Sequence, residues 1–149
     1  MSLKDRITDD MKAAMRAKDT ERLGTIRLLT AAMKQKEVDE RVELDDVAVI
    51  GIVDKMLKQR KDSIEAFEKA ARQDLADKEK AEIAILETYL PPPVSREELE
   101  KAVDEAVRTT GASSPKDMGG VMKAVMAGLA GRNADGKLIN ELVRARLAR

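Results

Sequence analysis

Apolar residues recur every three or four positions along most of this 149-residue chain, and this spacing limits the possible folds more than any other feature of the sequence. The spacing matches the 3.6-residue period of the α-helix, so each segment has one apolar face that must be buried against another segment. The sequence shows no run of the alternating apolar and polar residues that is typical of a strand. The pattern therefore predicts an all-α protein.

The amino-terminal part of the chain is expected to hold four helices. Ser2 and Thr20 are good helix-capping residues, and each precedes an apolar stripe. Asp45 begins the longest stripe, which only Arg60 interrupts. The four helices are expected from Leu3 to about Lys18, from Thr20 to just before Asp39, from Asp45 to Ala71, and from about Asp74 to Leu90.

Three consecutive prolines, Pro91 to Pro93, end the fourth helix, because proline lacks a backbone N–H and its ring clashes with the preceding turn. We interpret residues 91–93 as a stiff extended linker. Three short helices are expected beyond it, beginning at the capping pair Ser95 and Glu98, at Ser114-Pro115, and at Asp135. The sequence thus predicts a helical bundle or hairpin domain over residues 1–90 and a three-helix tail domain over residues 94–149.

Cysteine and histidine are both missing from the chain. Their absence excludes disulfides, thiolate chemistry, the usual zinc ligands and the usual general base near neutral pH. The sequence also has no glycine-rich phosphate loop and no cluster of carboxylates for a magnesium ion. We therefore expect no catalytic residue, no metal ion and no cofactor.

The first ten residues, Met1 to Asp10, carry mixed charges without an apolar run. No stretch of the chain approaches the ~20 apolar residues that a membrane span requires. These two observations predict a cytoplasmic protein that makes no contact with a membrane.

Basic residues gather at the carboxyl-terminal end, although the whole chain has 28 basic and 28 acidic residues. Only Asp117, Asp135 and Glu141 are acidic after Gly111. Lys116 and Lys123 are seven residues apart, as are Lys137 and Arg144, so each pair shares a helix face. This strip is a candidate nucleic-acid surface, and the alternative is an ordinary solvated face. The basic residues are Lys116, Lys123, Arg132, Lys137, Arg144, Arg146 and Arg149.

The aromatic residues restrict what kind of RNA contact is possible. Phe67 and Tyr89 are the only aromatic side chains, and both precede the basic strip. The strip therefore has no platform on which unpaired bases could stack. Any contact with RNA is expected to be made to its backbone and shape.

Several short motifs resemble, in their order and spacing, those of the YqeY-like family. Members of this family are related to the tail of the B subunit of glutamine-dependent aspartyl/glutamyl-tRNA amidotransferase, and the resemblance covers nearly the whole chain. One departure is Gly120, which stands where the family usually has a lysine. The motifs are Arg27-Leu28-Leu29, Lys58-Gln59-Arg60 with Ser63, Glu79, Tyr89-Leu90-Pro91, Asp117-Met118-Gly119 with Val121-Met122, and Asp135-Gly136.

The resemblance implies a four-helix part joined to a three-helix tail similar to the amidotransferase tail that meets tRNA. It also carries the label of a carbon–nitrogen ligase with glutamine as the amide donor. The sequence offers no nucleophilic side chain with a general base to activate it. We therefore predict a tRNA-associated accessory module that is not catalytic by itself. The alternative is a protein-interaction module that docks on a tRNA synthetase or amidotransferase without contacting RNA.

Three charged motif residues, Arg27, Arg60 and Glu79, fall on or beside stripes that should face the core. A buried charge must be paired. We therefore expect an ion pair between Glu79 and either Arg60 or Arg27. The alternative is a polar pocket for an anionic ligand between helices.

Gly119 and Gly120 lie near the start of the predicted sixth helix, where each costs about 1 kcal/mol relative to alanine. Close packing of helices would explain them. Approach of a phosphate to the free N–H groups is the alternative, although Asp117 in the same turn would repel a phosphate. The neighbouring methionines, Met118, Met122 and Met126, are expected to fill the core.

Overall fold

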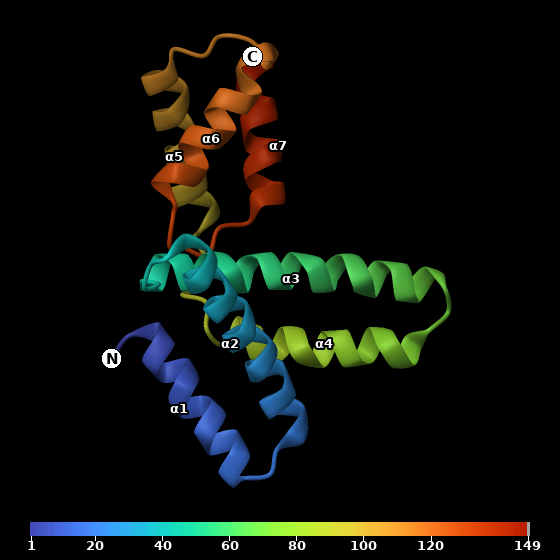
Figure 1. Ribbon diagram of the computed structural model, residues 1–149. Coiled ribbons are helices and arrows are strands. Elements are labelled where there is room, and N and C mark those ends of the chain that lie inside the picture. Colours follow the sequence, from blue (N-terminus) through green and yellow to red (C-terminus); the bar gives the residue numbers. More distant parts are fainter. Residues whose placement is uncertain (149) are drawn as a thin grey trace. The chain divides into compact units, whose positions relative to one another are not determined.

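The computed structural model describes residues 1–148, and all the regular elements in that range are helices (Figure 1). The prediction of an all-α fold is therefore confirmed. One isolated backbone bridge joins Pro93 and Asn133. The elements are α1 (Leu3–Arg16), α2 (Thr20–Glu40), α3 (Asp46–Lys69), α4 (Gln73–Glu87), α5 (Arg96–Thr110), the 3₁₀ turn η1 (Pro115–Asp117), α6 (Met118–Gly128) and α7 (Gly136–Leu147).

These helices divide into two compact units. The first unit runs from Met1 to Leu90 and contains α1 to α4. The second unit begins at Pro91 and contains α5, η1, α6 and α7. Each unit has a hydrophobic core of its own. No helix of the described residues is both long enough and apolar enough to cross a membrane.

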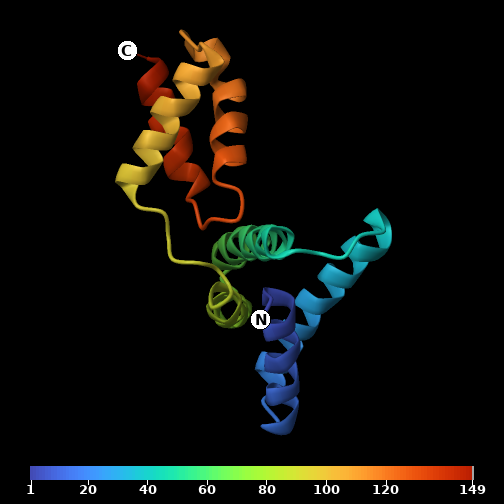
Figure 2. The ribbon, with the colours of Figure 1, turned by 90° about the vertical axis from the view of Figure 1, so that its left-hand side faces the viewer.

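The core of the first unit receives side chains from all four of its helices. Ile7 of α1, Leu29 of α2, Val53 of α3 and Leu86 of α4 are completely buried. The helices α3 and α4 form an antiparallel hairpin and lie side by side in both views (Figures 1 and 2). This core fixes the faces that α2 and α3 present to solvent.

Local capping explains where α1, α2 and α3 begin. The side chain of Ser2 accepts a hydrogen bond from the backbone N–H of Asp5, and Asp45 accepts one from Ala48. At α2 the cap is Asp19, which accepts from Arg22, rather than the expected Thr20. Both residue types favour this position, and the chain uses the aspartate, so that Thr20 becomes the first helical residue.

The second unit is built around α5, α6 and α7. Val103, Val121, Ile139 and Val143 form much of its buried core. Gly111 ends α5 with φ +69°, a left-handed conformation that glycine adopts without strain. The expected methionine core is only partly correct: Met118 and Met122 pack against the core, and Met126 is 40% exposed.

Hydrogen bonds hold the three prolines to the second unit. The backbone N–H of Val94 donates to the carbonyl of Asn133 at 2.8 Å, and the Asn133 side-chain amide donates to the carbonyl of Pro91 at 3.2 Å. Asn133 lies in the loop between α6 and α7. This proline segment is therefore attached to that loop at both of its ends.

Candidate functional site

Two of the basic residues predicted to bind nucleic acid are neutralised by carboxylates. Arg132 donates to Glu98 at 2.8 Å, and Arg146 donates to Asp104 at 3.1 Å. Both acids belong to α5, which precedes the basic strip in the sequence. Among residues 91–148 there are nine basic and eight acidic side chains. The second unit is therefore nearly neutral.

The other four predicted contacts are exposed and have no carboxylate within ion-pair distance among the described residues. Lys116 lies in η1, Lys123 in α6, and Lys137 and Arg144 in α7. Arg144 donates only to the side-chain oxygen of Asn140, at 3.2 Å. These four cations, Lys116, Lys123, Lys137 and Arg144, are called the free cations below. Arg149, the last basic residue, lies outside the described residues.

The motif Asp117-Met118-Gly119 lies at the start of α6. The Asp117 carboxylate is occupied by hydrogen bonds from the preceding loop. Asp117 accepts hydrogen bonds from the backbone N–H groups of Ser113 at 2.9 Å and Ser114 at 3.2 Å. The expectation that close packing requires Gly119 and Gly120 is wrong, because a Cβ added at either position would meet no atom within 4 Å. Both glycines are exposed.

The motif Asp135-Gly136 starts α7. The carboxylate of Asp135 accepts from the backbone N–H groups of Lys137 at 3.0 Å and Leu138 at 3.3 Å. Gly136 is the first residue of the helix. The aspartate is thus a helix cap, as the sequence predicted.

The first unit contains an ion-pair centre formed by Arg60, Glu79 and Glu82. The Arg60 Nε donates to Glu82 at 2.8 Å and lies 4.0 Å from Glu79, and its Nη1 donates to the carbonyl of Met56 at 3.3 Å. The Arg60 and Glu82 side chains are 12% and 13% exposed. The expected Arg60–Glu79 pair is present, but Glu82 is the nearer partner. Glu82 lies three residues after Glu79 and therefore on the same helix face, so the sequence contained a signal that Glu82 could also pair with Arg60.

Arg27 does not reach this centre. It is exposed and forms no ion pair among the described residues. The expected pair with Glu79 is therefore wrong for Arg27. Ile26 precedes it and Leu29 follows at two residues, and both face the core, which turns Arg27 outward.

Tyr89 joins the end of α4 to α1. Its hydroxyl donates to Asp10 at 2.7 Å, and the guanidinium of Arg6 lies 5.0 Å from the centre of its ring. Arg6 also donates to the carbonyl of Thr88 at 2.8 Å. Burial raises the pKa of the Tyr89 phenol above its ordinary value, and the hydrogen bond to Asp10 raises this pKa further. The buried ring and its two partners, Asp10 and Arg6, indicate a structural role for this motif residue.

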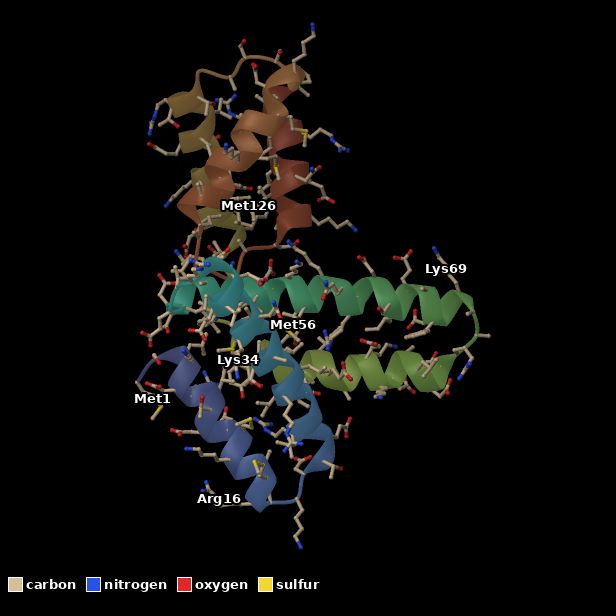
Figure 3. All side chains as sticks on the ribbon, viewed as in Figure 1. Met1, Arg16, Lys34, Met56, Lys69 and Met126 are labelled. Atoms are coloured by element: carbon tan, nitrogen blue, oxygen red, sulfur yellow. The ribbon has the colours of Figure 1, made fainter. Side chains whose placement is uncertain are left out.

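A groove between α2 and α3 was not anticipated from the sequence. Its volume is about 470 Å³, and Ala32, Gly51, Ile52 and Met56 contribute to its lining. Figure 3 marks Met56 on α3 and Lys34 on the neighbouring helix α2. Gln35, Lys36, Asp39, Glu40, Lys55 and Gln59 supply its polar lining. No group of three or more acidic side chains suited to a metal ion occurs within residues 1–148.

The architecture defines a class of small helical proteins with two compact units, and comparison with known proteins gives the family. The model of the family described as "Yqey-like protein" matches residues 4–147. The chain therefore belongs to the YqeY-like family, as its motifs indicated.

Fungal relatives carry the name "Altered inheritance of mitochondria protein 41, mitochondrial". The Kluyveromyces lactis protein is 40% identical over 112 residues, which are 73% of this chain and 60% of the relative. The Lachancea thermotolerans protein is 40% identical over 109 residues, which are 71% of this chain and 58% of the relative. The Pyrenophora tritici-repentis protein is 30% identical over 141 residues, which are 93% of this chain and 77% of the relative. The match thus spans about 60% of the length of the first two relatives.

These relatives contradict the expected cytoplasmic location, because all three are named as mitochondrial proteins. The expectation rested on the lack of an apolar run in Met1 to Asp10. Segments that direct import into mitochondria are amphipathic and basic rather than apolar. The missing apolar run therefore held no information about this location.

Proposed function

We propose that the chain is an accessory module of tRNA metabolism whose second unit binds the phosphate backbone of structured RNA. In this proposal the two compact units act as separate domains, four helices followed by three. The chemistry of an amidotransferase, which the family label of carbon–nitrogen ligase denotes, belongs to a partner protein.

The observation that carries the proposal is the set of free cations. Lys116, Lys123, Lys137 and Arg144 are exposed, and their charge is available to phosphates because no carboxylate of the described residues pairs with them. Arg132 and Arg146 would have to break ion pairs first. The electrostatic part of RNA affinity comes from the cations that contact phosphates rather than from net charge, so a nearly neutral unit remains compatible with binding.

The position of the aromatic residues decides which RNA fits. Tyr89 is 2% exposed, and Phe67 also lies in the first unit. The second unit therefore offers helices with cations at fixed positions and nothing on which loose bases could stack. Phosphates held at fixed positions by a folded RNA suit such a surface.

The experiment measures the affinity of the whole chain for tRNA at several salt concentrations. We expect tighter binding to tRNA than to an unstructured strand of equal length, and an affinity that falls with salt. Replacing Lys123 and Arg144 together by alanine should flatten the slope of log affinity against log salt by about 1 to 2, because each cation that contacts a phosphate releases about one counterion.

Two matched variants control this result. Lys34→Ala removes an exposed cation from α2 in the first unit and should leave the slope unchanged. Arg132→Ala removes a cation that Glu98 already holds and should change the slope less than Lys123→Ala does. No measurable affinity at low salt, or an unchanged slope in the double variant, would exclude the RNA function.

A second candidate function is docking on another protein without RNA contact. The observation that favours it is the exposure of large apolar side chains on the first unit, among them Leu28 at 51% and Val38 at 65%. Loss of the RNA function in the experiment above would leave docking as the function of the chain.

A further inference from the structure

Helix α2 carries apolar residues on two sides. Its inner side is the core, where Ile26, Leu29 and Met33 are buried. Its outer side carries Leu28, which is 51% exposed, and Val38, which is 65% exposed. A surface helix of a globular protein typically has a single apolar face. The second face of α2 therefore needs an explanation outside the core.

The outward residues follow a coiled-coil spacing. Gly24, Leu28, Ala31, Gln35 and Val38 recur at intervals of four and three residues, and all five are exposed. This is the mean spacing of 3.5 residues with which one helix packs along another. These residues are called the outer stripe, and at 1.5 Å per residue it is about 21 Å long. A partner helix of about four turns would cover it.

A row of positive charge borders one side of the outer stripe. Arg27 and Lys34 are seven residues apart, so the helical period places them one above the other beside Ala31 and Val38. Both are exposed, and neither forms an ion pair among residues 1–148. Figure 3 labels Lys34 on this helix. Residues at this place in a coiled coil select the partner through their charge.

The groove between α2 and α3 borders the other side of the outer stripe. Gln35 belongs to the stripe and also lines the groove, so the two features are continuous. Gly51 of α3 lines the groove as well, and a Cβ added there would meet no atom within 4 Å. The groove is thus open beside the stripe, with Ala32, Ile52 and Met56 as apolar lining.

We propose that the outer stripe and this groove bind one amphipathic helix of a partner protein, whose apolar seam is bordered by a row of aspartate or glutamate residues. The acidic row lies against Arg27 and Lys34, and apolar side chains of the partner enter the groove. A second copy of α2 packed antiparallel would place the two basic rows together, so the charges disfavour it as the occupant. This site lies on the first unit and is independent of the RNA surface proposed for the second.

The test uses the whole chain and a pair of designed helical peptides of three heptads. Both have leucine at the two seam positions and alanine at the flanking positions on one side of the seam. At the flanking positions on the other side, one peptide carries glutamate and the other carries lysine. Fluorescence anisotropy should show the glutamate peptide binding about tenfold more tightly, because two attractive pairs replace two repulsive ones. The charge-reversed chain with Arg27→Glu and Lys34→Glu should prefer the lysine peptide instead.

Two single variants separate the stripe from general stickiness. Leu28→Ser should weaken binding of the glutamate peptide about tenfold, because it removes the largest apolar side chain of the stripe. Met126→Ser replaces a comparably exposed apolar residue of the second unit and should leave binding unchanged. Both positions are on the surface, so circular dichroism should show both variants folded.

Three results would overturn the proposal. The first is no binding of either peptide, and the second is equal binding of both. The third is self-association of the unmodified chain in sedimentation that Leu28→Ser abolishes, which would identify a second copy as the occupant.

Discussion

Arg60 shows how one side chain stabilises the first unit. It lies between Glu82 at 2.8 Å and Glu79 at 4.0 Å, and it is 12% exposed. Removing one partner of a buried pair leaves an uncompensated charge, which costs more than the pair itself contributes. At this centre, two carboxylates would lose their common cation.

We therefore expect Arg60→Ala to lower the free energy of unfolding of the first unit by about 2 to 4 kcal/mol. The measurement is urea unfolding followed by tyrosine fluorescence. Arg27→Ala is the matched control; it removes an exposed, unpaired arginine and should cost less than about 0.5 kcal/mol. Equal losses in the two variants would mean that burial of Arg60 does not matter.

For single residues, the sequence predicted that Arg60 is buried and paired with a carboxylate. It did not predict which carboxylate is the nearer partner. Arg60 interrupts an apolar seam, so its burial and need for a carboxylate followed from the pattern. Arg27 looked equivalent, but each residue turns the helix by about 100°, and one position is enough to move a side chain from core to solvent. The choice of Glu82 over Glu79 depends on how α3 and α4 pack, and single-sequence periodicity does not fix this.

Helix α6 has two glycines in its first turn, Gly119 and Gly120, that its own unit does not require. A Cβ added at Gly119 or Gly120 would meet no atom within 4 Å, and neither residue has a positive φ. Glycine in a helix has more freedom to lose on folding than alanine has. The two positions therefore weaken the helix without a compensating contact inside the second unit.

Gly120→Ala should accordingly stabilise the second unit, by up to about 1 kcal/mol. Thermal unfolding followed by circular dichroism measures this change. Gly111→Ala provides the opposite case: its φ of +69° is strained for any residue with a Cβ, so this variant should destabilise by about 1 kcal/mol. A destabilising Gly120→Ala would show that the helix start is more crowded than described.

The starts of α1, α5 and α7 were predictable from the sequence because capping is local. Ser2, Ser95 and Asp135 each accept backbone hydrogen bonds from residues two or three positions ahead. The role of the glycines at 119 and 120 was not predictable, because packing depends on residues distant in the chain. Helical period alone also did not reveal that α2 has two apolar sides.

The whole chain contains one tyrosine and no tryptophan. Tyr89 is buried in the first unit, where its hydroxyl donates to Asp10. Tyrosine fluorescence therefore reports the first unit, while circular dichroism reports the helices of both units. Together, the two signals distinguish unfolding of the first unit from unfolding of the second in the intact chain.

If the units are separate domains, as proposed, a core change in one should leave the other unfolding as before. Ile26 and Ile139 are both completely buried, one in each unit. Either substitution by alanine should cost about 2 to 5 kcal/mol in its own unit. Ile26→Ala should shift the tyrosine transition, and Ile139→Ala should shift only the circular dichroism signal. An equal shift of the tyrosine transition in both variants would show one cooperative molecule.

Charge at the scale of the whole molecule was the hardest property to predict. The sequence predicts a basic strip along the carboxyl-terminal end, but Glu98 and Asp104 of α5 neutralise two of its arginines across more than thirty positions of sequence. Such pairs become visible only when helices are placed in space. The free cations are what remains of the predicted strip.

The hydrogen bonds of Asn133 also decide where the chain can be divided for expression. A fragment that starts at the cap of α5, Ser95, looks complete from its helices alone. It would lack the carbonyl of Pro91 and the N–H of Val94, both of which bond to Asn133. Such a fragment leaves a side-chain amide and a backbone carbonyl without their partners in the loop before α7. The prolines thus belong on the carboxyl-terminal fragment, and a cut is best placed before Pro91.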